Sequence, residues 1–84
     1  MSAYRILVVD DDRQSLEGLR ELVRSLGHAA DGAASASEAV RLLSQQSYDL
    51  VITDLVLPGG NGLGLLRQAR NRIANTPVVL VTGH

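Results

Sequence analysis

The chain of 84 residues contains no cysteine, so disulfides, thiolate metal ligands and thiol nucleophiles are excluded. It also contains no lysine, since all eight of its basic residues are arginine, and chemistry that needs a side-chain amine is excluded too. Phenylalanine and tryptophan are absent and only two tyrosines occur, which predicts a core of aliphatic layers. Because few aromatic side chains are available to stack on bases, recognition of single-stranded nucleic acid is disfavoured.

Neither sign of charge dominates, because eight arginines are balanced by nine carboxylates and the net charge is −1. This balance disfavours a dedicated surface for nucleic acid or for an anionic membrane. Long apolar runs are also lacking, since the first run, from Ile6 to Val9, stops at three aspartates. Met1 is therefore expected to begin neither a signal peptide nor a membrane helix, and we expect a cytoplasmic protein. The composition, 45% hydrophobic and 20% charged, is typical of one small globular domain.

Short apolar runs alternate with segments of helical periodicity along the chain. The runs predict strands at residues 5–9, 28–33, 48–54 and 78–81. Leucines and alanines at helical spacing predict helices at residues 15–26, 35–43 and 63–73. The resulting order β-α-β-α-β-α-β predicts an α/β fold with a parallel sheet, right-handed crossovers and helices on both faces.

Local signals mark where these helices begin and end. Gly27 follows the first helix and predicts its C-terminal stop. Ser35 and Glu38 have the spacing of a capping box at the start of the second helix. Residues 58–62 are rich in glycine, with one proline and one asparagine, and they predict a loop before the third helix.

Polar residues follow three of the predicted strands, at the edge where a doubly wound sheet binds its ligands. They are Asp10, Asp11 and Asp12 after the first strand, Asp54 at the end of the third, and Thr82 after the fourth. Carboxylates that converge repel one another unless a cation lies among them, and Mg²⁺ prefers such hard oxygen ligands together with phosphate. Taken singly, these residues also fit simple structural roles, and for Asp12 we favour one, the capping of the first helix.

Four motifs, in this order, resemble the receiver domain of two-component response regulators. They are Ile6-Leu7-Val8-Val9-Asp10-Asp11, Leu50-Val51-Ile52-Thr53-Asp54, Leu57-Pro58-Gly59-Gly60-Asn61-Gly62 and Pro77-Val78-Val79-Leu80-Val81-Thr82. The resemblance implies a CheY-like, flavodoxin-like α/β fold, a doubly wound parallel sheet of strand order 2-1-3-4. Residues 1–84 are then the N-terminal part of a single receiver domain, because the family's fifth strand and last two helices have no counterpart here.

The resemblance also implies a role for each residue at this edge of the sheet. Asp54 would take a phosphoryl group from a sensor histidine kinase, or from a small acyl phosphate. Asp11 would bind Mg²⁺ directly and Asp10 through water, with Asp54 and the backbone carbonyl of Val56 completing the protein's ligands. Thr82 would hydrogen-bond the phosphoryl oxygen as a switch hydroxyl. Such a domain is a phosphoprotein of a phosphorelay and not a turnover enzyme; DNA would be bound, and transcription regulated, only through an output domain absent from this chain.

The chain departs from the family in ways that keep a second hypothesis open. The family's phosphate-binding lysine lies at the end of its fifth strand, and this chain has no lysine. The alternative is therefore a receiver-like interaction module or fragment that is not phosphorylated. Without a fifth strand, residues 78–81 become an apolar edge, which predicts a homodimer or a domain swap. The loss also predicts an exposed apolar patch on the first helix, formed by Leu16, Leu19, Leu22 and Leu26.

An enzymatic function is a further hypothesis, because Asp10-Asp11-Asp12 resembles the Asp-x-Asp motif at the start of haloacid dehalogenase-type phosphatases. That family has Thr or Val two residues after the second aspartate, where this chain has Gln14, and it needs a lysine. We therefore disfavour this function. His28 and His84 are expected to face solvent and are assigned no role.

Overall fold

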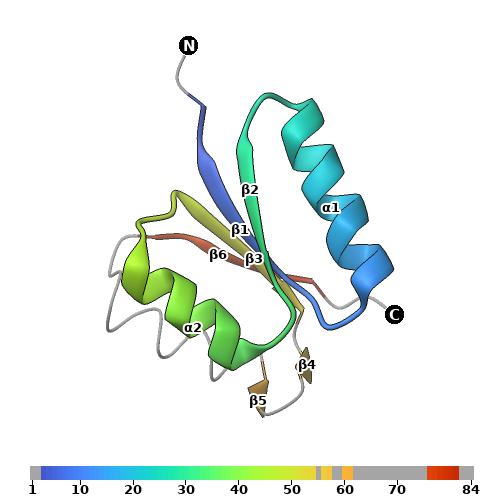
Figure 1. Cartoon of the computed structure of the whole chain (residues 1–84), viewed down its shortest axis with the longest axis vertical. Helices are drawn as coiled ribbons and strands as arrows, with labels where there is room; N and C mark the ends of the chain where they lie inside the picture. The colour runs from blue at the N-terminus through green and yellow to red at the C-terminus, as the bar shows by residue number, and fades with distance from the viewer. Residues whose placement is uncertain (1–2, 55, 58–59, 62–75, 82–84) are drawn as a thin grey trace.

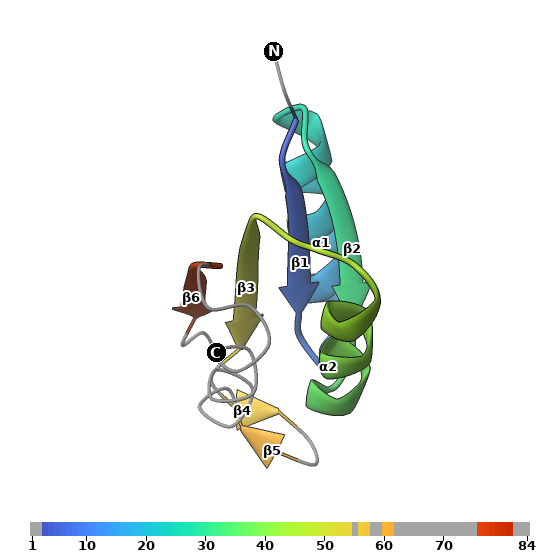
Figure 2. The same ribbon diagram turned by 90° about the vertical axis from the view of Figure 1, so that its left-hand side faces the viewer.

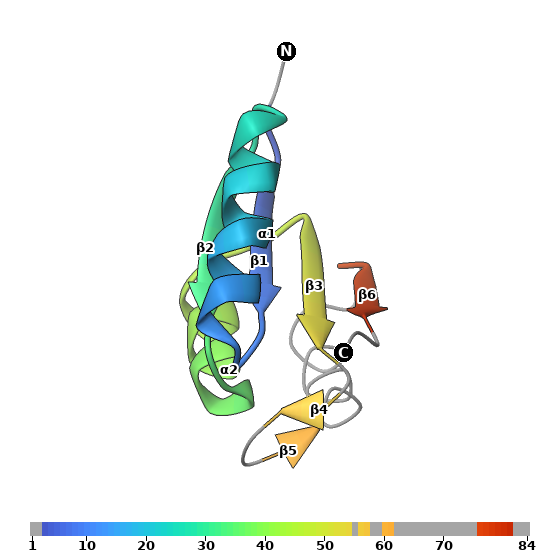
Figure 3. The ribbon, with the colours of Figure 1, turned by 90° about the vertical axis from the view of Figure 1, so that its right-hand side faces the viewer.

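The computed structural model describes residues 3–54, 56–57, 60–61 and 76–81. Their core is a parallel sheet of strand order β2-β1-β3-β6 (Figure 1). Its strands are β1 (Arg5–Val9), β2 (Ala29–Ala33), β3 (Leu50–Asp54) and β6 (Val78–Val81). The helices are α1 (Arg13–Ser25) and α2 (Ala36–Gln45), which Figures 2 and 3 place on opposite faces of the sheet. Numbered within this sheet alone, the order is 2-1-3-4, so the predicted doubly wound α/β fold is confirmed.

Strand β1 lies in the interior of the sheet, between β2 and β3. It pairs in parallel with both neighbours, and Val9 lies opposite Ala33 on one side and Thr53 on the other. Residues 6–9 are all buried. A continuous apolar run is what a strand covered on both faces requires, because its alternate side chains enter two separate layers of the core.

The two layers of the core are aliphatic, as the composition predicts. On the face of α2 the buried residues are Leu7, Val9, Ala33, Ala39, Leu43, Tyr48 and Val51. On the face of α1 they are Ile6, Val8, Leu16, Val23 and Ala30. The one aromatic side chain among these, Tyr48, completes the α2 layer at the turn that leads into β3.

Helix α1 begins at Arg13, two residues before the predicted start. Asp12 is its N-cap residue, and the carbonyl of Asp12 accepts the N–H of Leu16 at 2.9 Å. The Asp12 side chain, however, makes no hydrogen bond to the backbone N–H groups of the first turn and accepts the hydroxyl of Ser15 at 2.8 Å. The predicted capping position is therefore confirmed, but side-chain capping of the helix by Asp12 is wrong.

Two further local signals act as predicted. Gly27 has a φ of 93°, a left-handed conformation that glycine adopts without strain, and it ends α1. The Ser35 side chain accepts the N–H of Glu38 at 3.2 Å, which confirms the Ser35 cap at the start of α2. Each signal acts through neighbours within three residues, so the sequence is sufficient to locate it.

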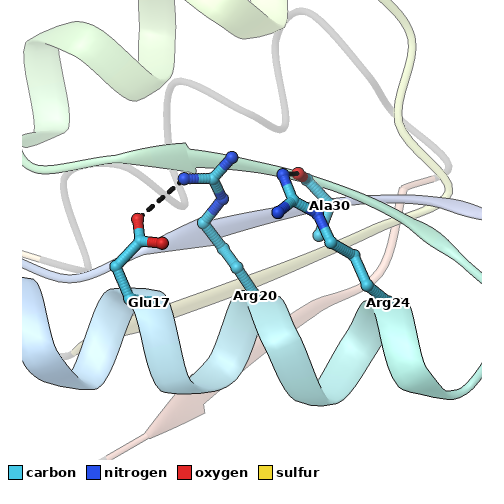
Figure 4. A network of polar contacts seen from close by, with 4 residues as sticks. All are labelled: Glu17, Arg20, Arg24 and Ala30. Carbon is cyan, nitrogen blue, oxygen red and sulfur yellow. Dashed lines mark hydrogen bonds and ion pairs between the residues drawn. The ribbon is translucent and has the colours of Figure 1, made fainter.

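Glycine at position 32 lets α1 pack closely on the edge strand β2. A Cβ at Gly32 would lie 2.9 Å from Cδ of Arg20 and 3.2 Å from a methyl carbon of Leu16. Figure 4 shows Arg20 and Arg24 extending from α1 over β2, with Arg24 donating to the carbonyl of Ala30 at 3.5 Å. The arginines thus cover one flank of α1 and the strand beneath it.

The other flank of α1 leaves apolar side chains exposed. Leu22 and Leu26 are 55% and 66% exposed, which confirms their place in the predicted patch, whereas Leu16 is buried in the core. On the edge strand β6, Val79 is 48% exposed. Within the described residues, no helix is both long and apolar enough to cross a membrane.

Two predictions need correction. Residues 60–61 belong to β5 (Gly60–Asn61), which pairs antiparallel with β4 (Val56–Leu57) and is not simply loop. His28 is half-buried and does not simply face solvent, because its Nδ1 accepts the N–H of Tyr4 at 3.1 Å as β2 begins beside β1. The predicted helix at 63–73, and His84, lie outside the described residues.

Candidate acidic site at the carboxyl edge of the sheet

Asp10 is held by the sheet one residue beyond the end of β1. Its backbone N–H donates to the carbonyl of Ala33 at 3.0 Å, which extends the pairing of β1 with β2. Its side chain is buried, and the residue is only 7% exposed. The first predicted site residue is therefore fixed at the carboxyl edge of the sheet, where the loops that bind ligands meet in this fold.

The carboxylate of Asp10 has a backbone partner. Its Oδ1 accepts the N–H of Asp12 at 2.9 Å. Burying a carboxylate costs free energy unless hydrogen bonds or a cation compensate for the lost water. Within the described part of the chain, Asp10 forms no ion pair. The compensation shown among the described residues is therefore one hydrogen bond.

Asp54 is the last residue of β3, on the strand that neighbours β1. The register pairs Val9 with Thr53, and Asp54 with Val81 of β6. Asp10 and Asp54 each come one position after the paired residues Val9 and Thr53, so they lie at the same edge of the sheet, at the ends of adjacent parallel strands. The structure thus brings the backbone positions of these two aspartates together; the carboxylate of Asp54 lies outside the part described.

The remaining predicted residues are placed less completely. Asp11 follows Asp10 and is exposed to solvent. Val56 lies in β4, where it pairs with Asn61, just after the end of β3. Thr82 lies outside the described residues, although it follows Val81 directly in the chain. The structure therefore places the backbone of Asp10 and Asp54 at one edge of the sheet, and the roles of all the predicted site residues stay predictions.

The donor set at this edge suits a hard cation. Among the side chains that the structure describes, no three histidine, cysteine, aspartate or glutamate residues are grouped to hold a metal ion. The predicted set includes the carboxylate of Asp54, which is not among them. The buried carboxylate of Asp10 and the exposed one of Asp11 beside it are oxygen ligands of the kind that Mg²⁺ takes together with several waters. Asp10, Asp11 and Asp54 are the residues that would hold the ion.

One polar contact that supports β3 was not predicted from the sequence. Tyr48 is 4% exposed, and its hydroxyl donates to Oδ2 of Asp31 on β2 at 2.7 Å. Burial, reinforced by the hydrogen bond and the negative charge of Asp31, raises the pKa of Tyr48 to about 12. The two residues are 17 positions apart, and neither carries a local signal for the other. This hydrogen bond connects the segment before β3 to β2, which lies on the other side of β1 in the sheet.

Thr53 is a second residue that the sequence did not single out. It is fully buried at the end of β3, immediately before Asp54, and opposite Val9. Thr53 therefore buries a hydroxyl one residue before the predicted acceptor, on the opposite face of the strand from it. Its β-branched shape also fits a strand, so the sequence pattern alone offered no reason to separate it from its neighbours.

Comparison with known proteins agrees with this geometry. A family model described as the response regulator receiver domain matches residues 6–84. The chain belongs to this family. Among curated relatives, the transcriptional regulatory protein PmrA of Pectobacterium parmentieri is 40% identical over 78 residues, 93% of this chain and 35% of that protein. The transcriptional regulatory protein ResD of Bacillus subtilis is 36% identical over 78 residues, 93% of this chain and 32% of that protein.

Solved receiver structures match the fold closely. A response regulator receiver protein from Pseudomonas putida has a TM-score of 0.90 at 35% identity, covering 100% of this chain and 71% of the other. The response regulator TrrA of Thermotoga maritima, solved in complex with Mg²⁺-BeF, has a TM-score of 0.91 at 34% identity. That match covers 96% of this chain and 70% of the other. The predicted receiver family and CheY-like fold are therefore confirmed, and receiver domains are signalling domains.

The coverage of these matches differs between the two kinds of relative. The chain spans about a third of the length of PmrA and ResD, and about 70% of the two receiver structures. What the longer relatives do as whole proteins is therefore carried to this chain only as a proposal.

Proposed function

We propose that this receiver domain accepts a phosphoryl group on Asp54 in a Mg²⁺-dependent reaction. The observation that carries the proposal is the register of β1 and β3, which sets the buried Asp10 beside the strand end that bears Asp54. The ion is held by Asp10, Asp11, Asp54 and the backbone carbonyl of Val56. The match to a receiver solved with Mg²⁺-BeF supports this assignment.

The chemistry needs charge compensation more than covalent assistance. Phosphoryl transfer places negative charge on the equatorial oxygens, and Mg²⁺ supplies both neutralisation and orientation. The side chain of Asp54 is the nucleophile: its oxygen forms the new bond to phosphorus as the bond to the donor's leaving group breaks. The product carries about −1.5 to −2 charges and three strong acceptor oxygens, one of which Thr82 would bind. The inward movement of that hydroxyl then biases the surface at the end of β6.

The proposed partners follow from the relatives. A sensor histidine kinase donates the phosphoryl group, and the response is passed to a DNA-binding output domain in a longer protein. The names of PmrA and ResD support the second part, because both are transcriptional regulatory proteins about three times the length of the matched region. The domain itself turns over no substrate.

The intact mass of the chain after incubation with acetyl phosphate tests the proposal. We expect a gain of one phosphoryl group, about 80 Da, when Mg²⁺ is present, and no gain when EDTA removes it. The dependence on Mg²⁺ is expected because the acidic edge repels an incoming phosphate without the ion. A folded chain that gains no mass in Mg²⁺ would favour the alternative, an interaction module that is not phosphorylated.

We also propose that β6 mediates self-association. It is the edge strand of the described sheet, residues 78–81 carry no charge, and Val79 is 48% exposed. Uncharged edge strands with free backbone groups pair readily with a second copy, which completes the sheet as a dimer or by a domain swap.

Val79→Arg is expected to weaken self-association about tenfold or more, because the positive charges of the two arginines would be buried near each other where the β6 strands of the two copies pair. Sedimentation equilibrium over a concentration series measures the effect. Ala29→Arg is the matched control, since Ala29 is exposed on β2 at the opposite edge of the same sheet. A wild-type chain that stays monomeric at every concentration, or equal weakening by both variants, would contradict pairing through β6.

A further inference from the structure

We propose that the backbone N–H of Asp12 positions the carboxylate of Asp10 in the cation site by donating a hydrogen bond to its Oδ1. This inference rests on the proposed function, since it concerns the Mg²⁺ site of that reaction. The carboxylate of Asp12 is not the group that acts. By occupying one oxygen of Asp10, the N–H leaves Oδ2 for the ion or for one of its waters.

The backbone of Asp10 is fixed first. Its N–H is used in the bond to Ala33 on β2, so the residue continues the strand and cannot swing with the loop that follows. The hydrogen bond from the Asp12 N–H to Oδ1 then fixes the side chain. A carboxylate held at both its backbone and one oxygen presents its other oxygen in one direction, which is what a site for an ion with strict octahedral geometry requires.

The carbonyl and the carboxylate of Asp12 both accept hydrogen bonds from helix α1, and these bonds fix the direction of its N–H. Its φ of −84° and ψ of 116° are those of an N-cap residue, and its carbonyl accepts the N–H of Leu16 in the first bond of α1. The hydroxyl of Ser15 donates to its carboxylate at 2.8 Å. The N–H is therefore aimed by the start of a helix of 13 residues that packs on the sheet, and not by a free loop.

The bond also explains why a buried carboxylate is tolerated beside a second acidic residue. The N–H at the start of α1 carries partial positive charge, and it gives the buried carboxylate of Asp10 a hydrogen-bond partner. One such bond compensates only part of the cost of burial, and the rest falls to the cation. Removing a group that hydrogen-bonds to a metal ligand commonly weakens metal binding by about 10- to 100-fold.

Two variants at one position separate the N–H from the carboxylate. Asp12→Ala removes the carboxylate and keeps the N–H, whereas Asp12→Pro removes both. Proline requires only a small adjustment of the backbone here, because the observed φ of −84° lies just outside the range of about −65 ± 15° that its ring allows. Isothermal titration with Mg²⁺ alone is expected to give a Kd about tenfold weaker for Asp12→Pro than for Asp12→Ala. Circular dichroism and thermal unfolding show whether both variants are folded at the titration temperature.

Hydrogen exchange of the Asp12 amide provides a second measurement that needs no proline. In the metal-free wild type this amide is expected to exchange slowly, and Asp10→Ala is expected to accelerate its exchange at least tenfold. In wild-type protein saturated with Mg²⁺ the amide is expected to stay protected, because the bond persists while Oδ2 serves the ion. Loss of its protection on Mg²⁺ binding would overturn the inference even if the proline variant did not fold.

The outcomes distinguish this inference from the proposed function. If wild type and Asp12→Ala bind Mg²⁺ and Asp12→Pro binds equally well, the positioning role is wrong and the metal site stands. If wild type shows no saturable binding of Mg²⁺, the metal site of the proposed function is wrong, and the positioning role falls with it. Weaker binding by Asp12→Pro alone, with a protected amide in wild type, supports both.

Discussion

Asp54→Asn is expected to abolish the gain of a phosphoryl group from acetyl phosphate, the largest effect that a single substitution can have on the proposed function. An amide cannot form the acyl phosphate, because its oxygen is far less nucleophilic than that of a carboxylate. The change is nearly isosteric and lies at the end of β3, so the parallel pairing with β1 and β6 should be kept. Intact-mass measurement in Mg²⁺ should show the unmodified mass only.

Asp49→Asn is the matched control for this substitution. Asp49 lies just before β3, at the end of the strand away from Asp54, and its Oδ2 accepts the N–H of Arg5 at 2.8 Å. An amide oxygen can accept the same bond, so this variant should gain the phosphoryl group as the wild type does. Modification that persists in Asp54→Asn would place the acceptor elsewhere, and peptide mapping would identify it.

The stability of the chain is expected to fall steeply with rising pH between about 10 and 12. The pKa of Tyr48 rises from 10.0 to about 12 on folding, because burial and Asp31 disfavour its anion. The protonated hydroxyl therefore stabilises the native state in full below pH 10, and this contribution is lost as pH rises towards the folded pKa. A shift of about two units corresponds to about 2 to 3 kcal/mol, a large share of the stability of a small domain.

The composition makes the effect of Tyr48 easier to measure in this pH range. The chain has no lysine and no cysteine, so the ordinary pKa values of those two side chains do not overlap the range in which Tyr48 loses its proton. Urea unfolding at several pH values should show the fall in wild type and a much flatter profile in Tyr48→Phe. Tyr4→Phe should keep the wild-type slope, since Tyr4 is exposed. An equal slope in wild type and Tyr48→Phe would show that Tyr48 is not the group responsible.

Features with a local cause were predicted from the sequence. The buried run of β1 follows from consecutive apolar β-branched and leucine residues, and the start of α2 follows from Ser35 and Glu38, three residues apart. Gly27 ends α1 because few other residues adopt its backbone conformation. The order of these elements predicted a parallel sheet and the edge at which Asp10 and Asp54 lie, whereas the strand order 2-1-3-4 was implied by the resemblance to receiver domains.

By itself, then, the sequence determined the α/β architecture, the receiver family and the edge of the sheet that carries the acidic residues. The tertiary structure decided the polar contacts around these elements: the N–H of Asp12 donates to Asp10, the hydroxyl of Tyr48 to Asp31, and the N–H of Tyr4 to His28. The last two bonds join residues 17 and 24 positions apart, and their formation depends on strand register and burial. The first is local, but it was hidden because an aspartate before a helix predicts a side-chain cap, whereas here its backbone N–H turns to the buried carboxylate two residues earlier.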